Sequence, residues 1–429
     1  MMIKSLLIAL VLLFSGHLSF SQSLPLIRAN SEKISIKDGN NPLTRYWDHL
    51  NGKVRPLVYS IDKTNQIRTV IFYTDIDSIA FDVFPGKLYN FNVLLRGKDT
   101  CHVQLSTVIQ SSIHNASGTS GADTIPFILG TDQYIHIKGK INHFRELDLI
   151  FDTGASLFVL TEKGLSKSKV ILDGSTENQG AGGFSTERTS SRNHLELANL
   201  YWKDLPILFY DYKGGLNADG VVGYNVFEDK VVEIDYDKGL LIIHQNLPDL
   251  KKDYSELPAR HSIEGTFVEA TVQKDMNAAK GWFLFDTGGG LTVAVSGNFA
   301  NKNDLHRRLA IMGYANVSGT GAVVNKTEIA ILPELKLTGF VLRDVPVRLN
   351  VQNSDYYGKA GIIGNAVLKR FNTIIDYPHG KIYLKPNHLL NTSFEPLKWG
   401  RILGIAVIGI LMLSVGAFLF VKLKRRKSS

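Results

Sequence analysis

The sequence predicts a mainly β protein whose larger part consists of two similar lobes related by a pseudo-twofold axis. Three observations support this prediction. Alternating and β-branched segments dominate the body of the chain, a long stretch of the sequence repeats once, and an uncharged apolar segment lies near each end. A smaller β domain is expected before the two lobes, and one transmembrane helix after them.

Length and composition narrow the class of protein. The chain has 429 residues, which suits two or three domains, and 44% of them are hydrophobic. So much apolar material with only 13 prolines argues against a disordered or collagen-like chain. The single cysteine, Cys101, rules out an internal disulfide framework and a cysteine-rich zinc module, and we expect it to be a buried apolar residue.

The net charge of +8 comes mainly from the two ends of the chain. Lys4 lies near the start, and the C-terminal segment 422–429 contains five further Lys and Arg residues. The remainder of the chain is therefore close to neutral, so we expect no nucleic-acid partner.

The first 21 residues are typical of a signal peptide. Lys4 precedes an apolar run from Leu6 to Phe14, and Ser19 and Ser21 lie at the small-residue positions near the expected cleavage site. The apolar run is short for a bilayer. An N-terminal membrane helix is the alternative interpretation.

Residues 402–421 contain no charged side chain and are long enough to cross a membrane as a helix. A juxtamembrane segment (387–401) precedes them, and the basic tail (422–429) follows. By the positive-inside rule, the tail is expected to be cytoplasmic and the bulk of this single-pass protein to be exported, on the periplasmic or extracellular side. A buried core helix is the alternative.

The exported part begins with an expected N-terminal β domain (22–109) and a Ser/Gly-rich linker (110–123). Four segments of this domain show strand patterns: 54–61, 67–74, 78–84 and 89–95. Helices are expected only at a short stretch after Gly223, another after Gly364, and a longer one near Asn298 to Met312.

The internal repeat defines lobe 1 (124–247) and lobe 2 (248–386). An apolar run ends in Asp-Thr-Gly at Asp152 and again at Asp286, 134 residues later. An apolar-apolar-Gly pattern ends at Gly223 and again at Gly364, 141 residues later. Both lobes are therefore expected to fold alike, as a pseudo-dimer within one monomeric chain.

An apolar strand that ends in Asp-Thr-Gly can hold one carboxylate rigidly, because its buried length fixes the position of the acid. Thr153 and Thr287 can brace the turns through their hydroxyls, and Gly154 and Gly288 allow tight turns beside the carboxylates. Two such acids facing each other cannot both ionise, so the pair shares a proton. One acid can then activate a water while the other protonates a carbonyl.

These motifs resemble those of the aspartic proteases of the pepsin and retropepsin clan, and most closely the retropepsin-like type. FDTGAS at 151–156 and FDTGGG at 285–290 are similar to the catalytic motif, and Gly223 and Gly364 to the second signature of the family. The resemblance covers residues 124–384, and the overall layout is similar to exported, membrane-anchored proteins of Bacteroidetes bacteria. It implies an aspartic-protease β fold, Asp152 and Asp286 as the catalytic pair, and a polypeptide substrate.

The resemblance also implies a flap that closes over the substrate. In lobe 1 the glycine-rich segment QGAGGF is similar to such a hairpin, and lobe 2 has a weaker counterpart at SGTGAVV. The candidate flap residues are Gly180, Gly182, Gly183, Phe184, Gly319 and Gly321.

Both lobes depart from the two-domain pepsin pattern. Ala155 and Gly289 stand where those enzymes usually have a hydroxyl-bearing residue, and Gly289-Gly290 predicts a looser loop around Asp286. No HExxH, CxxC, GxSxG or phosphate-binding loop is present, so we expect no metal and no cofactor. Two alternatives to a peptidase remain: a non-catalytic module that binds peptides in the same cleft, and Asp residues that only cap turns.

Overall fold

The computed structural model describes residues 23–394 with internal gaps. The gaps are residues 40–44, 49, 51, 53–55, 61–66, 108–113, 116–121, 173, 181–182, 213–214, 250–252, 263–264, 318–324 and 353–358. The predicted signal peptide, transmembrane helix and tail lie outside the described residues. Of the predicted juxtamembrane segment (387–401), residues 387–394 are described and residues 395–401 are not. Among the described helices, none has both the length and the apolar character needed to span a bilayer.

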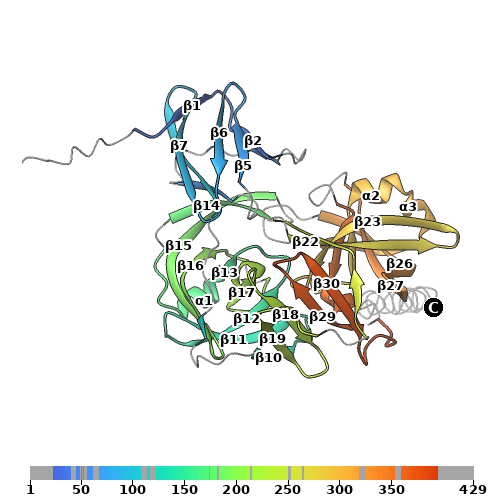
Figure 1. Cartoon of the computed structure of the whole chain (residues 1–429). Coiled ribbons are helices and arrows are strands. Elements are labelled where there is room, and N and C mark those ends of the chain that lie inside the picture. The colour runs from blue at the N-terminus through green and yellow to red at the C-terminus, as the bar shows by residue number, and fades with distance from the viewer. Residues whose placement is uncertain are drawn as a thin grey trace, which may run out of the picture. The chain divides into compact units, whose positions relative to one another are not determined.

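Contacts divide the chain into two units, residues 1–108 and 109–429. Both units consist mainly of strands, which confirms the predicted mainly β class. The described helices are all short, as Figure 1 shows.

The first unit consists of two four-stranded sheets, with strand orders β1-β7-β8-β4 and β3-β2-β5-β6. Its strands are β1 (Leu26–Ala29), β2 (Lys33–Asp38), β3 (Arg45–Asp48), β4 (Leu57–Ser60), β5 (Arg68–Tyr73), β6 (Ser78–Val83), β7 (Leu88–Leu95) and β8 (Asp99–Ser106). The four segments with strand patterns form β4 to β7, as predicted. Inward-facing residues of both sheets share one core, in which Phe72 and Phe91 make an edge-to-face contact and Cys101 is fully buried.

The second unit begins with the elements of lobe 1. They are β9 (His114–Asn115), β10 (Asp123–Leu129), β11 (Ile135–Ile141), β12 (Glu146–Asp152), β13 (Phe158–Leu160), α1 (Glu162–Ser166), β14 (Gly174–Gly180), β15 (Gly183–Leu197), β16 (Leu200–Phe209), β17 (Gly220–Gly223), the 3-10 helix η1 (Tyr224–Val226), β18 (Val231–Asp235) and β19 (Leu240–His244). Strand β9 lies within the predicted linker and pairs with β16.

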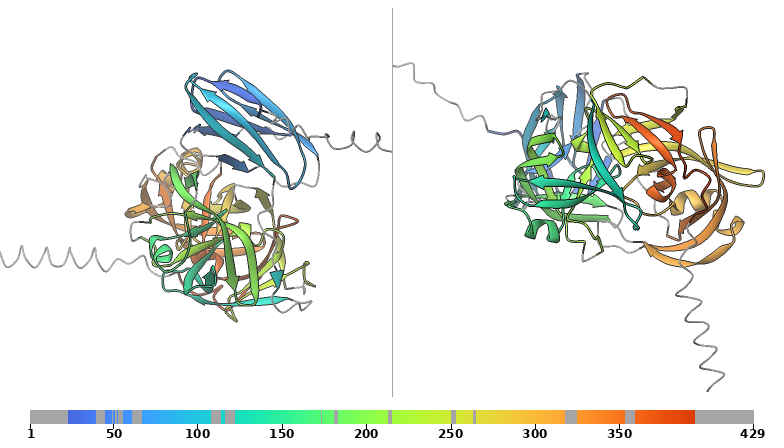
Figure 2. Two further views of the ribbon diagram at one scale, coloured as in Figure 1. Left: turned by 90° about the vertical axis from the view of Figure 1, so that its left-hand side faces the viewer. Right: turned by 90° about the horizontal axis from the view of Figure 1, so that it is seen from below.

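The elements of lobe 2 repeat this order. They are β20 (Ser255–Leu257), β21 (Ala259–Ser262), β22 (Gly265–Lys274), β23 (Asn277–Asp286), β24 (Val293–Val295), α2 (Gly297–Lys302), α3 (Leu305–Arg308), β25 (Ile311–Val317), β26 (Asn325–Leu337), β27 (Phe340–Asn350), β28 (Gly361–Gly364), α4 (Asn365–Leu368), β29 (Phe371–Asp376) and β30 (Lys381–Pro386). In the right-hand view of Figure 2, the green strands of lobe 1 and the yellow to red strands of lobe 2 occupy opposite sides of the unit.

A central sheet with the order β10-β19-β18-β29-β30-β20 joins the two lobes. Strands β18 and β29 are antiparallel neighbours, and Glu233 of β18 lies opposite Ile374 of β29. These two residues are 141 positions apart, which is the spacing of the sequence repeat. A residue that faces its own repeat across an antiparallel pair lies on a twofold axis, so the lobes are related by the predicted pseudo-twofold symmetry.

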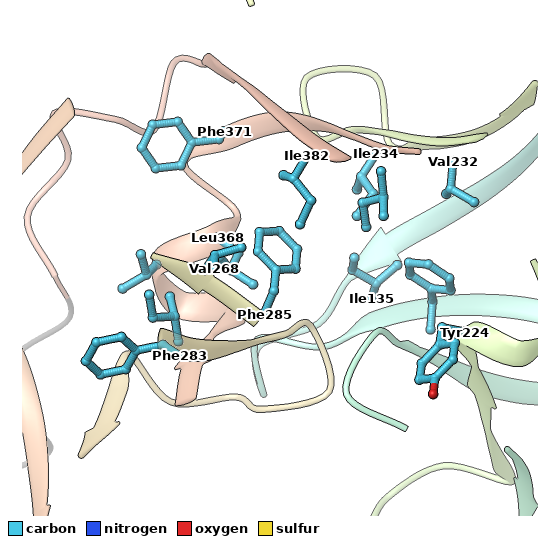
Figure 3. Close-up of a cluster of buried hydrophobic side chains, with 14 of the residues drawn as sticks. Ile135, Tyr224, Val232, Ile234, Val268, Phe283, Phe285, Leu368, Phe371 and Ile382 are labelled. Atoms are coloured by element: carbon cyan, nitrogen blue, oxygen red, sulfur yellow. The ribbon is translucent and has the colours of Figure 1, made fainter. Parts of the chain in front are cut away.

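Side chains of both lobes share one hydrophobic core. Ile135 and Ile234 of lobe 1 and Phe285 and Ile382 of lobe 2 are all buried in it (Figure 3). Because burial of apolar surface stabilises folding in proportion to its area, neither lobe is expected to be stable without the other.

The expected helices are present, with one difference. Short helices η1 and α4 follow Gly223 and Gly364 as predicted. The single helix expected near Asn298 to Met312 is two helices, α2 and α3, because Asp304 between them has a left-handed backbone (φ 56°) that interrupts the helix.

Candidate active site

Two buried strands place the acids of the Asp-Thr-Gly motifs. Strand β12 ends at Asp152 and β23 ends at Asp286, and the phenylalanine before each acid is fully buried. Each strand pairs in parallel with a short strand of its own lobe, so that Asp152 lies beside Gly223 and Asp286 beside Gly364. Because the register is the same in both lobes, the two acids occupy equivalent positions, each at the end of its strand beside a glycine.

Gly223 and Gly364 are required by the loops that pass over them. A Cβ atom at Gly223 would lie 2.4 Å from the carbonyl oxygen of Leu157, and one at Gly364 would lie 2.3 Å from that of Leu291. No other residue fits such an approach. This explains why the apolar-apolar-Gly pattern accompanies Asp-Thr-Gly in both lobes.

The two threonines join the loops across the pseudo-twofold axis. The Thr153 hydroxyl donates to the Phe285 carbonyl oxygen (2.7 Å) and accepts from the Thr287 N–H (3.0 Å). The Thr287 hydroxyl donates to the Phe151 carbonyl oxygen (2.9 Å) and accepts from the Thr153 N–H (3.0 Å). Both threonines are fully buried, so these four hydrogen bonds are shielded from water and hold the two loops together.

The glycines of the two motifs face the acid of the opposite lobe. A Cβ atom at Gly288 would lie 2.1 Å from Asp152 Cγ. A Cβ atom at Gly154 would lie 2.7 Å from Asp286 Oδ1 and 3.2 Å from Asp152 Oδ1, so these two oxygens are less than about 6 Å apart. The two carboxyls are therefore close enough for each to influence the pKa of the other.

The environments of the two acids differ. The N–H groups of Gly154 and Ala155 donate to Asp152 Oδ1 (2.7 and 3.0 Å), whereas Asp286 Oδ1 is buried and has no hydrogen-bond partner among the described residues. Burial raises the pKa of Asp152 despite these donors. Burial, followed by the charge of Asp152, raises the pKa of Asp286 well above its usual range. The arrangement therefore favours one proton shared by the pair.

A lobe 1 loop between β10 and β11 packs against the second motif. A Cβ atom at Gly290 would lie 2.5 Å from the Asp132 carbonyl oxygen and 3.2 Å from Tyr134. In the same loop Gln133 accepts hydrogen bonds from Asn365 and Lys369 of lobe 2, each at 2.6 Å. The glycine pair 289–290 thus allows a close contact between the lobes. The β10–β11 loop of lobe 1 packs against the glycine-rich loop after Asp286, which the sequence predicted to be looser.

Two tyrosines near the acids have no motif that would have indicated them. Burial, together with the charges of Asp286 and Asp152, raises the pKa of Tyr134. Burial and the charge of Asp152 also raise the pKa of Tyr212. Tyr212 packs edge-to-face on Tyr210. Both tyrosines remain neutral phenols beside the acid pair, where they could bind apolar or hydrogen-bonding groups.

The flap residues are described only in part. Strands β14 and β15 form an antiparallel hairpin in which Gly180 lies opposite Gly183 and Gln179 opposite Phe184. The hairpin predicted in lobe 1 is therefore present, while Gly182 at its tip lies outside the described residues. In lobe 2 strands β25 and β26 also pair, but Gly319 and Gly321 between them lie outside the described residues.

Within the described part of the chain, one group of histidine and carboxylate side chains is close enough to share a metal ion. It consists of His143, in the turn before β12, and of His194 and Glu196 near the end of β15. Asp152 ends β12, so the group lies at the opposite end of that strand from the acid pair.

Comparison with known proteins finds a family model that matches part of the chain. A family model described as "Aspartyl protease" matches residues 137–226, which include Asp152 and Gly223. A search of the curated proteins finds no match. The matched segment supports a peptidase at the level of the family, and the mainly β fold is consistent with it.

Proposed function

We propose that the chain is an aspartic endopeptidase in which Asp152 and Asp286 activate a water between them. The observation that supports this most strongly is the geometry of the pair. Carboxylate oxygens of two acids from repeated motifs lie less than about 6 Å apart, and the four threonine hydrogen bonds tie their loops together. In this mechanism the ionised acid removes a proton from the water, which attacks the peptide carbonyl. The protonated acid donates to the carbonyl oxygen, and no covalent enzyme intermediate forms.

The asymmetry of the pair assigns the starting roles. Asp152, whose pKa is raised less than that of Asp286 and whose Oδ1 accepts from the Gly154 and Ala155 N–H groups, ionises more readily and therefore acts as the general base. Asp286, with the strongly raised pKa, begins as the acid. The β14–β15 hairpin closes over an extended substrate and excludes bulk water, with Gly180, Gly182, Gly183 and Phe184 at or near its tip. Gly319 and Gly321 provide the weaker counterpart in lobe 2.

The experiment compares three forms of the purified chain on an unfolded, fluorescently labelled protein from acidic to neutral pH, with and without pepstatin. We expect the wild type to cleave and Asp152→Asn to lose cleavage while its circular dichroism spectrum is unchanged. Asp275→Asn is the matched control, because Asp275 lies in an exposed turn with a left-handed backbone that asparagine also adopts.

Cleavage that persists in Asp152→Asn would contradict the mechanism. Absence of cleavage at every pH, with peptide binding that survives Asp152→Asn, would favour the non-catalytic peptide-binding module instead.

We also propose that the protein is exported, that residues 402–421 anchor it in the membrane and that residues 422–429 are cytoplasmic. An anchor so close to the second unit restricts substrates to proteins at the same membrane face. Alkaline phosphatase fused after residue 394 should be active, and the same enzyme fused after residue 429 should be inactive. The reverse result would contradict this topology. Because one chain supplies both acids, we propose a monomer, which light scattering on the purified protein tests.

A further inference from the structure

The group His143, His194 and Glu196 lies on a rigid part of lobe 1. His194 and Glu196 are two residues apart on β15, so their side chains project from the same face of the strand. His143 lies in the turn between β11 and β12. Asn142 and His143 both have left-handed backbones, with φ of 53° and 54°.

Asn142 fixes this turn against β15. Its N–H donates to the His194 carbonyl oxygen, and its side-chain oxygen accepts from the His194 N–H, both at 2.8 Å. Its side-chain nitrogen donates to the side chain of Asn193 (3.0 Å). Left-handed residues are unfavourable outside glycine, and these three hydrogen bonds offset that cost. As a result the His143 side chain is held beside β15.

The three candidate ligand atoms converge on one point. Both His143 Nδ1 and His194 Nε2 contact Glu196 Oε1, the second at 3.4 Å, and all three atoms lie within 4.8 Å of one another. Ligand atoms around a tetrahedral zinc ion with bonds of about 2.0–2.1 Å are about 3.3–3.4 Å apart. The group therefore needs little rearrangement to bind such an ion.

The second histidine distinguishes this group from ordinary ion pairs of the same fold. His244 pairs with Glu233 (2.9 Å) and His306 with Glu328 (2.7 Å), each with a single imidazole. At the present group two imidazole rings lie with their centroids 4.2 Å apart. Two protonated rings at that distance would repel each other, whereas two neutral rings can both donate lone pairs to a cation.

Neighbouring groups fix the position of His194. Its ring stacks on Tyr201, at a centroid distance of 5.4 Å. Its backbone N–H is bound by the Asn142 side chain, so both the backbone and the ring of this ligand are held.

The corresponding positions of lobe 2 have a different chemistry. Leu197 pairs with Leu200 beside the β15–β16 turn of lobe 1, and Leu337 pairs with Phe340 beside the equivalent β26–β27 turn of lobe 2. By this register Glu334 and Lys336 correspond to His194 and Glu196. These two side chains form their own ion pair at 3.4 Å. The fold itself thus does not require the histidine group, which lobe 1 has and lobe 2 lacks.

We propose that His143, His194 and Glu196 bind a divalent transition-metal ion, zinc above all, with a water completing a tetrahedral site. Two imidazole nitrogens and one carboxylate oxygen form a donor set suited to zinc. The ion would fasten the β11–β12 turn to the end of β15. Strand β12 leads to Asp152 and β15 begins at the flap hairpin, so the ion would join the far ends of both strands. The site is separate from the acid pair and does not depend on the proposed peptidase activity.

The test uses the full chain purified without a histidine tag and stripped of metal with a chelator. Titration calorimetry with zinc should show one site with a dissociation constant in the micromolar range or lower. Zinc should also raise the melting temperature. His143→Gln, His194→Gln and Glu196→Gln should each weaken binding by at least about 10-fold and reduce the thermal shift. Cobalt(II) bound to the wild type should show the intense visible bands of a four-coordinate site.

His244→Gln is the matched control, because it removes a histidine from a single His–Glu pair of the same lobe. It should bind zinc as the wild type does. The proposal is wrong if the wild type takes up no zinc in the micromolar range, or if His194→Gln binds as tightly as the wild type. Cleavage by Asp152→Asn would overturn the proposed peptidase while leaving the zinc result intact, so the two failures are distinguishable.

Discussion

Replacing Thr153 with valine tests whether the threonine hydrogen bonds hold the two lobes together at the acid pair. Valine keeps the shape of the side chain but removes the hydroxyl, and with it the bonds to the Phe285 carbonyl oxygen (2.7 Å) and the Thr287 N–H (3.0 Å). Both groups would then be buried without these partners. Each unsatisfied buried polar group costs about 1–3 kcal/mol, so the loss of two partners should lower the free energy of unfolding of the second unit by about 2–6 kcal/mol.

The assay is urea unfolding of the purified chain followed by circular dichroism, with peptidase activity measured on the same samples. We expect activity to fall together with stability, because the loops that place the acids lose half of their mutual hydrogen bonds. Ser166→Ala is the control. It removes one exposed hydrogen bond to the Lys163 carbonyl oxygen (2.7 Å) and should change stability by less than about 1 kcal/mol. A Thr153→Val variant as stable as this control would refute the reasoning.

Three further predictions concern the surroundings of the acids. Burial raises the pKa of Asp286 in the folded chain, so as the pH rises above about 4 this carboxyl ionises in the unfolded chain before it ionises in the folded one. The free energy of unfolding therefore falls with rising pH until the folded-state pKa is reached. Asp286→Asn removes this loss, so thermal unfolding should show it to be more stable than the wild type at pH 7 and to lose that advantage near pH 3. Gly288→Ala places a Cβ 2.1 Å from Asp152 Cγ and should lower kcat/KM by about 100-fold or more, whereas Gly313→Ala, with nothing within 4 Å, should not. Tyr236→Phe removes a buried hydrogen bond of 2.5 Å to an asparagine of α4 and should cost about 1–3 kcal/mol in urea unfolding, and a loss below about 0.5 kcal/mol would contradict this.

The parts of the site that a local pattern encodes could be predicted from the sequence. Asp152 and Asp286 follow apolar strands, and the glycines at 223 and 364 follow short apolar runs at matching distances. The two lobes repeat these patterns, so one prediction supports the other. The prediction of one helix near Asn298 to Met312 was only partly right. A single left-handed residue interrupts the helix there, and the periodicity of the sequence does not reveal such a residue.

The parts that depend on contacts between distant segments could not be predicted. Tyr134 and Tyr212 lie near the acids because the fold brings distant segments of the chain together, and neither tyrosine belongs to a motif. His143 and His194 are 51 residues apart and meet only because the β11–β12 turn packs beside the end of β15. No spacing rule for metal ligands covers such a pair, which is why sequence motifs predicted no metal.

The sequence by itself determined the mainly β class, the repeat and the two acids, because periodic burial and short turn motifs are local properties of the chain. Only the tertiary structure decided that the repeats face each other. The pairing of β18 with β29 places Glu233 opposite Ile374, and the buried hydroxyls of Thr153 and Thr287 bond across the same axis. The difference in pKa between the two acids is likewise tertiary. Both have the same motif, and the groups packed around each acid distinguish them.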